Sequence, residues 1–208
     1  MVELLPFLGL CLLITVTPGL DTAVVLRNTM QGGVGAGVRT GLGCALGLFV
    51  HAVAVAYGLA ELLLRSETAF MVVKLVGAGV LVVLGGRSLW SAVRTRDAHQ
   101  VADAAPARAP RGTPMLQGLL TNLTNPKATL FFMASLPQFV PMDRPAHAVP
   151  IALGLAMIAV LFSLTGLGLV AVGAGKVRHL LRSRRVRRIQ EALLGTTLVA
   201  LGVRVATE

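Results

Sequence analysis

Charge is scarce in this sequence. Only 13% of its 208 residues are Asp, Glu, Lys or Arg, while 55% are hydrophobic. Average soluble domains carry roughly 25% charged residues, so the chain has too few to cover a soluble globule of its size. The same hydrophobic content excludes an intrinsically disordered chain, and two cysteines are too few for a disulfide-held scaffold. With a mean hydropathy of +0.78, the chain is predicted to be a multi-span membrane protein.

Sequence signatures of enzyme chemistry are also missing. The chain has no cluster of metal-ligating residues, no nucleophile elbow and no phosphate-binding loop. We therefore expect no soluble-type active site and no metal. An intramembrane enzyme is disfavoured because no nucleophile–base pair is evident.

Six apolar stretches are each long enough to be read as a transmembrane helix, for which about 18 residues suffice. The first is kept as part of the mature protein, because it has Glu3 where a signal peptide has basic residues. The stretches are Leu4–Leu26, Thr40–Leu64, Thr68–Trp90, Pro114–Leu136, Pro150–Ala174 and Ile189–Val205.

The basic residues are distributed unevenly between the two sides that these stretches define. Fourteen of the nineteen Lys and Arg residues fall on one side, four on the other, and Lys127 lies inside the fourth stretch. A Lys/Arg excess marks the cytoplasmic side, so we expect both termini to lie outside.

A nucleic-acid partner is not expected from this basic charge. The cytoplasmic linker, about residues 95–113, has no aromatic side chain on which a base could stack. The cluster Arg182–Arg188 is placed instead to contact anionic lipid head groups of the bilayer.

The chain divides into two similar halves. Pro18 and Pro126 are 108 residues apart, each within the first stretch of its half, and the same offset carries the second stretch onto the fifth. Three stretches is an odd number, so the second half enters the membrane from the opposite side. We therefore predict an all-α membrane protein of six transmembrane helices arranged as two inverted three-helix repeats. The single domain 1–208 would contain repeat 1, about 1–94, and repeat 2, about 114–208.

One charged residue lies near each of the two prolines. Asp21 and Lys127 cost at least ~2.5–3.5 kcal/mol each at membrane depth, so they are functional candidates. Their matched positions predict that they face a common cavity, although a static pair that fixes the packing of the halves is the alternative. The predicted substrate and proton pathway is Thr17, Pro18, Gly19, Asp21, Asn125, Pro126 and Lys127, with Thr15, His51, Asn122 and Thr124 as further candidates.

Two of the remaining features have a structural and a functional interpretation. His51 lies in the middle of the second stretch, where it is either a packing residue or part of a proton relay. Glycines spaced by four residues allow close helix packing, and the run Gly32–Gly37 could form a hinge. Exposed glycine-rich faces are also compatible with a homodimer.

The sequence resembles the LysE/RhtB superfamily of bacterial amino-acid exporters over nearly all of its length. The resemblance rests on four motifs, and it departs from the usual family pattern at Leu20, Val80 and Val83, where a proline and two aromatic residues are common. The motifs are Thr17-Pro18-Gly19-Leu20-Asp21, Gly37 through Gly47, Lys74 through Gly85, and Asn125-Pro126-Lys127-Ala128 followed by Phe131-Phe132.

The resemblance implies export of a small amino acid or derivative across the bacterial inner membrane, driven by the proton gradient and without a cofactor. Together with the paired prolines, it leads to the hypothesis of an alternating-access exporter that has its site between two broken helices. Two alternatives stay open: a structural or scaffolding subunit of a membrane complex, and an exporter of a cation or another small metabolite.

Overall fold

The protein is helical throughout the part that the structure describes. The computed structural model describes residues 4–93, 112–140, 147–174 and 183–207, so most of the predicted 95–113 linker lies outside the described residues. The all-α prediction is confirmed for these ranges. The helices are α1 (Leu4–Val16), α2 (Leu20–Arg65), α3 (Glu67–Val93), α5 (Pro114–Leu123), α6 (Pro126–Phe139), α7 (Ala148–Val172) and α9 (Arg184–Thr207).

Two helix breaks occur at the two prolines. α1 ends at Val16 and α2 begins at Leu20, while α5 ends at Leu123 and α6 begins at Pro126. Proline has no backbone N–H and disfavours the helical conformation of the residue before it. At the second break the chain is also capped, because the Asn125 side chain accepts a hydrogen bond from Lys127 N at 3.0 Å.

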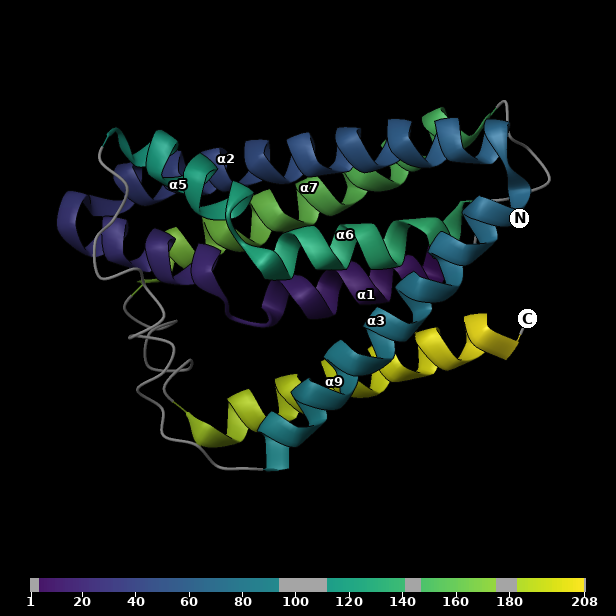
Figure 1. The fold of residues 1–208 in the computed structure, drawn as a ribbon. Helices are drawn as coiled ribbons and strands as arrows, with labels where there is room; N and C mark the ends of the chain where they lie inside the picture. The colour runs from purple at the N-terminus through teal and green to yellow at the C-terminus, as the bar shows by residue number, and fades with distance from the viewer. Residues whose placement is uncertain (1–3, 94–111, 141–146, 175–182, 208) are drawn as a thin grey trace.

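A third break lies inside α2. Gly33 has φ +76° and ψ 179°, and the chain reverses direction there (Figure 1). A positive φ is strained for residues with a Cβ atom and readily adopted by glycine. Helix therefore continues beyond the end of the predicted stretch Leu4–Leu26, and it begins before the predicted stretch Thr40–Leu64. The two helical segments meet at Gly33, so the predicted hinge Gly32–Gly37 is a break at one residue.

Four of the described helices contain a stretch that is long and apolar enough to cross a bilayer alone. These stretches are Leu20–Leu59, Glu67–Val93, Ala148–Val172 and Arg188–Thr207. α1, α5 and α6 are each shorter than the roughly 20 residues that a crossing needs. Six spans therefore stay a prediction. They are reached only if α1 crosses the bilayer together with the beginning of α2, and α5 together with α6.

The helices pack through small residues. α3 and α9 lie side by side, and α2 contacts both α5 and α7 (Figure 1). A Cβ atom added at Gly85 would lie 2.7 Å from the Gly195 carbonyl oxygen, and one added at Gly195 would lie 2.7 Å from the Gly85 carbonyl oxygen. Glycine at both positions therefore permits this close approach of α3 and α9.

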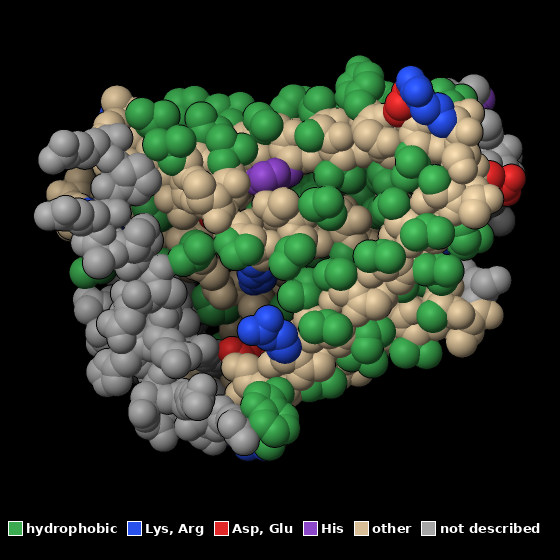
Figure 2. Space-filling view, in the orientation of Figure 1, with side chains coloured by type: hydrophobic (Ala, Val, Ile, Leu, Met, Phe, Trp, Pro, Cys, Tyr) green, Lys and Arg blue, Asp and Glu red, His purple; other side chains and the backbone are tan. Residues whose placement is uncertain are grey.

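The outer surface of the helices is apolar. Only 28% of the most apolar stretch of α3, α7 and α9 is buried inside the protein, and Figure 2 shows hydrophobic side chains spread over much of the visible face. In water such a surface would be an aggregation hazard. In a bilayer it is the surface expected to contact lipid.

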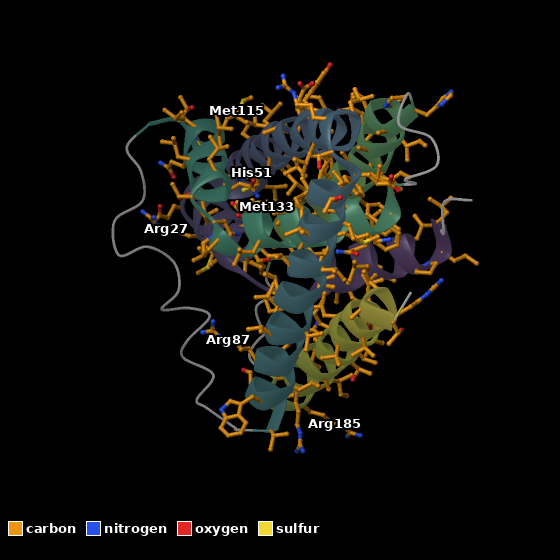
Figure 3. All side chains as sticks on the ribbon, turned by 45° about the vertical axis from the view of Figure 1, so that its right-hand side comes forward. Arg27, His51, Arg87, Met115, Met133 and Arg185 are labelled. Carbon is orange, nitrogen blue, oxygen red and sulfur yellow. The ribbon has the colours of Figure 1, made fainter. Side chains whose placement is uncertain are left out.

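The arrangement of the chain ends can be compared with the charge distribution. α1 begins and α9 ends at the right-hand side of Figure 1. Arg27 lies in the first segment of α2, Arg87 near the end of α3 and Arg185 at the start of α9 (Figure 3), and these segments lie toward the left-hand side of Figure 1. Which side faces the cytoplasm stays a prediction.

Candidate functional site

The break between α1 and α2 lies against the break between α5 and α6. Asn122 Nδ2 donates to Asp21 Oδ2 at 2.7 Å, and Asn125 Nδ2 donates to Asp21 Oδ1 at 3.2 Å. In the opposite direction, Lys127 Nζ donates to the Thr17 carbonyl oxygen at 3.1 Å. Three hydrogen bonds thus join segments that are more than 100 residues apart in the chain.

The Asp21 carboxylate is held at the beginning of a helix. Asp21 lies in the first turn of α2, where the positive end of the helix dipole favours a negative charge. Each of its two oxygens accepts one side-chain amide N–H from the second break. A carboxylate can accept about four hydrogen bonds, so Asp21 is fixed in place and still able to bind a further donor.

The Lys127 ammonium bonds to a carbonyl that the first break leaves outside both helices. The first hydrogen bond of α2 runs from Ala23 N to Gly19 O at 3.0 Å, which leaves the Thr17 carbonyl beyond the start of that helix. The stem of Lys127 lies over Gly19, where an added Cβ would be 3.6 Å from Lys127 Cδ. The carbonyl end of α1 favours a cation, which gives the ammonium a favourable position without a carboxylate partner.

Asp21 and Lys127 line the same cavity without pairing directly. Among the described residues, each charge is bonded to the uncharged groups given above, and no ion pair joins the two. The cavity has a volume of about 80 Å³. A water molecule needs roughly 10–15 Å³ on this measure, so the cavity has room for roughly five to eight water molecules. A small amino acid has a similar number of non-hydrogen atoms.

The cavity wall comes from four helices and the two breaks. Polar residues cluster at the breaks, and α6 and α7 supply most of the apolar wall. The lining residues are Cys11, Ile14, Thr15, Thr17, Gly19, Asp21, Thr22, Leu48, Asn125, Lys127, Ala128, Phe131, Phe132, Ala159, Ser163 and Leu167.

The structure thus brings together most of the residues singled out in the sequence. Thr15 lines the cavity, while Asn122 lies behind it as a donor to Asp21. Pro18 and Pro126 shape the breaks and are not among the lining residues of the described chain. Thr124 is exposed, and its hydroxyl bonds back to the Leu120 carbonyl oxygen at 2.8 Å, so it caps α5 and does not reach the cavity.

His51 lies beside the second break (Figure 3). Its Nε2 atom is 3.4 Å from both the Asn122 carbonyl oxygen and Thr129 Oγ1. Thr129 also donates to the Asn125 carbonyl oxygen at 3.2 Å. Through these contacts His51 packs against the backbone of the second break and helps to hold its conformation.

Several polar residues at the site were not singled out in the sequence. Thr22 and Ser163 line the cavity, and the spacing of Ser163 from Ala159 and Leu167 by four residues was the available signal. Outside the cavity lining, Asn28 Nδ2 of α2 donates to Gln117 Oε1 of α5 at 2.9 Å. No signal in the sequence marked this pair, because both residues lie at the polar ends of the predicted stretches.

Comparison with known proteins assigns the chain to a family. The family model described as LysE type translocator matches residues 12–208, which is nearly the whole chain. The chain belongs to the LysE family. The resemblance drawn from the motifs is thereby confirmed, and this LysE-family protein is a membrane transporter and not an enzyme.

The relatives of this LysE-family protein include proteins named for efflux. It is 29% identical to the leucine efflux protein of Klebsiella pneumoniae, over 93% of this chain and 90% of the relative. It is 32% identical to the homoserine/homoserine lactone efflux protein of Salmonella typhimurium, over 71% and 69% respectively. It is 27% identical to the uncharacterized membrane protein YrhP of Bacillus subtilis over 97% of both chains. No solved structure matches.

Proposed function

We propose that the protein is a secondary active exporter of a small amino acid or a close derivative. The observation that carries the proposal is the meeting of two helix breaks at one cavity, with one carboxylate and one ammonium on its wall. Broken backbone at membrane depth is tolerated where it is buried in protein or lines a cavity. The names of the leucine and homoserine efflux relatives support an amino acid as the substrate.

The architecture proposed for this exporter is six spans in two inverted repeats within one membrane domain. α1 would cross together with the first segment of α2, and α5 together with α6, so that each repeat begins with a broken span. The second segment of α2 and α3 complete repeat 1, while α7 and α9 complete repeat 2. Broken first spans at matched positions are the usual place of the binding site in such transporters.

A zwitterionic amino acid would bind by taking over the existing polar contacts. Its carboxylate would attract the Lys127 ammonium away from the Thr17 carbonyl, which is then free to accept from the substrate's ammonium group. Asp21 would hold the same ammonium group from the other side. The beginning of α2 has no side-chain cap at Gly19, so its N–H groups are also available to a carboxylate.

Proton coupling is proposed for Asp21. When the substrate leaves, the carboxylate loses its cationic partner in a poorly hydrated site, so protonation is the way to neutralise it. A proton bound on the outside and released inside would then drive export by alternating access between the two repeats. We propose the bacterial inner membrane as the location, with both termini outside.

The proposal is tested by export of labelled amino acids from proteoliposomes. Asp21→Asn should abolish proton-driven export, and Lys127→Met should abolish export of zwitterions, with both variants inserted normally. Glu61→Gln is the matched control, because this exposed carboxylate pairs with Arg65 at a helix end far from the cavity lining. Full transport by the Asp21→Asn variant would refute the proton role.

A further inference from the structure

The cavity has a polar end and an apolar end. The polar end lies at the two breaks, where Asp21, Asn125 and Lys127 line it. Farther from the breaks the lining residues are apolar, with Cys11 of α1 and Phe132 of α6 among them. A ligand with charged groups at one end and an apolar chain at the other matches this division, because a charge buried without a partner is far more costly than a buried apolar chain.

The direction from the polar end to the apolar end follows from the helices that carry these residues. An α-helix rises about 1.5 Å per residue, so Phe132 lies about 7.5 Å beyond Lys127 on α6, and Cys11 lies about 6 Å before Thr15 on α1. α1 ends at its break whereas α6 begins at its break, so both displacements lead away from the breaks, toward the right-hand side of Figure 1. The apolar end of the cavity therefore points to the side of the protein at which α1 begins.

Aromatic rings close the apolar end. Phe132 lines the cavity and is only 2% exposed. Farther along α6, Phe139 meets Phe7 of α1 edge-on, with ring centroids 5.0 Å apart, and both rings are buried. Among the described residues, neither of these two rings lines the cavity. Because the interior beyond Phe132 is filled by side chains, a bound chain has no further room in that direction.

Phe132 also stands in line with a small residue one turn nearer to the breaks. Ala128 and Phe132 are four residues apart on α6, so they lie on the same face of that helix. Ala128 leaves room beside Lys127 for the first atoms of a substrate side chain, and Phe132 occupies this face where the side chain would continue. The Phe132 ring is supported by Phe131, which also lines the cavity and meets it edge-on with centroids 5.7 Å apart.

We infer that Phe132 sets the longest side chain that the transporter accepts, because a bound amino acid has its carboxylate and ammonium groups at the breaks and its side chain directed at this ring. The inference rests on the proposed function, to which it adds the orientation of the substrate and the residue that limits its length. Removal of the ring opens space between Ala128 and Phe139 on α6. A smaller residue at this position should therefore admit longer substrates, and it should hold short ones less well because the space around them is unfilled.

The test is a series of straight-chain amino acids, each one methylene group longer than the one before. The full-length protein in proteoliposomes is given L-alanine, L-2-aminobutyrate, L-norvaline, L-norleucine or L-2-aminoheptanoate. The wild type should show a cut-off, a step at which one more methylene group lowers the export rate at least about tenfold, as one methylene group does in a hydrophobic pocket. Phe132→Ala should move this cut-off to a longer member of the series and export L-alanine more slowly than the wild type. Phe132→Leu, which changes the packing less, should export the first rejected substrate faster, relative to the last accepted one, than the wild type does.

Phe139→Ala is the matched control, because Phe139 is also a buried phenylalanine of α6 and does not line the cavity. It should leave the cut-off where the wild type has it, whatever its effect on the overall rate. A cut-off that stays in place in both Phe132 variants, or that Phe139→Ala moves as far as Phe132→Ala does, would overturn the inference. A wild type that exports other amino acids but shows no cut-off in this series, or exports none of its members, would overturn it and leave the proposed function standing. Export of no amino acid would refute both.

Discussion

Gly85 and Gly86 are neighbours in α3 that should respond oppositely to the same substitution. A Cβ added at Gly85 would lie 2.7 Å from the Gly195 carbonyl oxygen and 2.8 Å from a methyl carbon of Val199, both in α9. A Cβ added at Gly86 has no atom within 4 Å. Gly85→Ala therefore inserts a methyl group into the contact between two helices, and Gly86→Ala places the same group on the exposed surface.

The difference in stability can be worked from these distances. Favourable contacts begin at roughly 3.5 Å, so α9 must move by roughly 0.8 Å to accept the Gly85→Ala methyl group. Overpacking of this kind costs about 1–3 kcal/mol. Both substitutions gain the same helix propensity, about 0.8–1 kcal/mol, and this gain cancels in the comparison. Gly85→Ala should therefore be less stable than Gly86→Ala by about 1–3 kcal/mol.

The assay is thermal unfolding of the two purified variants in one detergent at one fixed scan rate, since membrane proteins often unfold irreversibly. For a chain of this length, each kcal/mol shifts the midpoint by about 2–4 °C. Gly86→Ala should equal or exceed the wild-type midpoint, and Gly85→Ala should fall several degrees below Gly86→Ala. Equal midpoints for the two variants would refute the reasoning that α3 and α9 touch at Gly85.

Three further predictions concern the breaks. Gly33→Ala should lower the unfolding midpoint by several degrees relative to Gly35→Ala, because the positive-φ, extended-ψ conformation of Gly33 costs about 1–3 kcal/mol for a residue with a Cβ; equal midpoints would contradict a break at Gly33. Asn122→Ala should lower the rate of amino-acid export at least tenfold, because it removes a hydrogen bond to the Asp21 carboxylate of about 1.5–3 kcal/mol; export within twofold of wild type would show that this bond does not position Asp21. His51→Ala should keep export coupled to protons, because the ring nitrogen Nε2 contacts the Asn122 carbonyl oxygen and Thr129 Oγ1 beside the break, each at 3.4 Å, and not the Asp21 carboxylate directly; loss of proton coupling with export retained would restore the relay hypothesis.

The two principal breaks could be predicted because proline acts through the backbone. Pro18 and Pro126 remove a donor and restrict the residue before them regardless of what packs nearby, and the helices do end at Val16 and Leu123. The position of Asp21 and Lys127 beside these breaks follows from the sequence as well. What each charge bonds to does not follow, because the Thr17 carbonyl and the Asn122 amide reach them only when the two breaks dock.

Two other features of the structure, the break at Gly33 and the place of Ser163 in the cavity wall, could not be predicted from the sequence. Gly33 is one glycine among several between Leu26 and Thr40, and nothing in the sequence marks which of them takes the positive φ. Ser163 looked like an ordinary helix hydroxyl, since most of these bond to their own helix. Its role as a cavity residue depends on the tertiary placement of α7.

Proton movement during amino-acid export is the measurement that tests the central claim most directly. Proteoliposomes that contain the full-length protein and a pH-sensitive dye are given an outward amino-acid gradient without any imposed pH difference. The proposed mechanism predicts that protons move in the direction opposite to the amino acid, and that Asp21→Asn abolishes this proton flux. Amino-acid export by the wild type without proton movement, or an undiminished proton flux in Asp21→Asn, would contradict it.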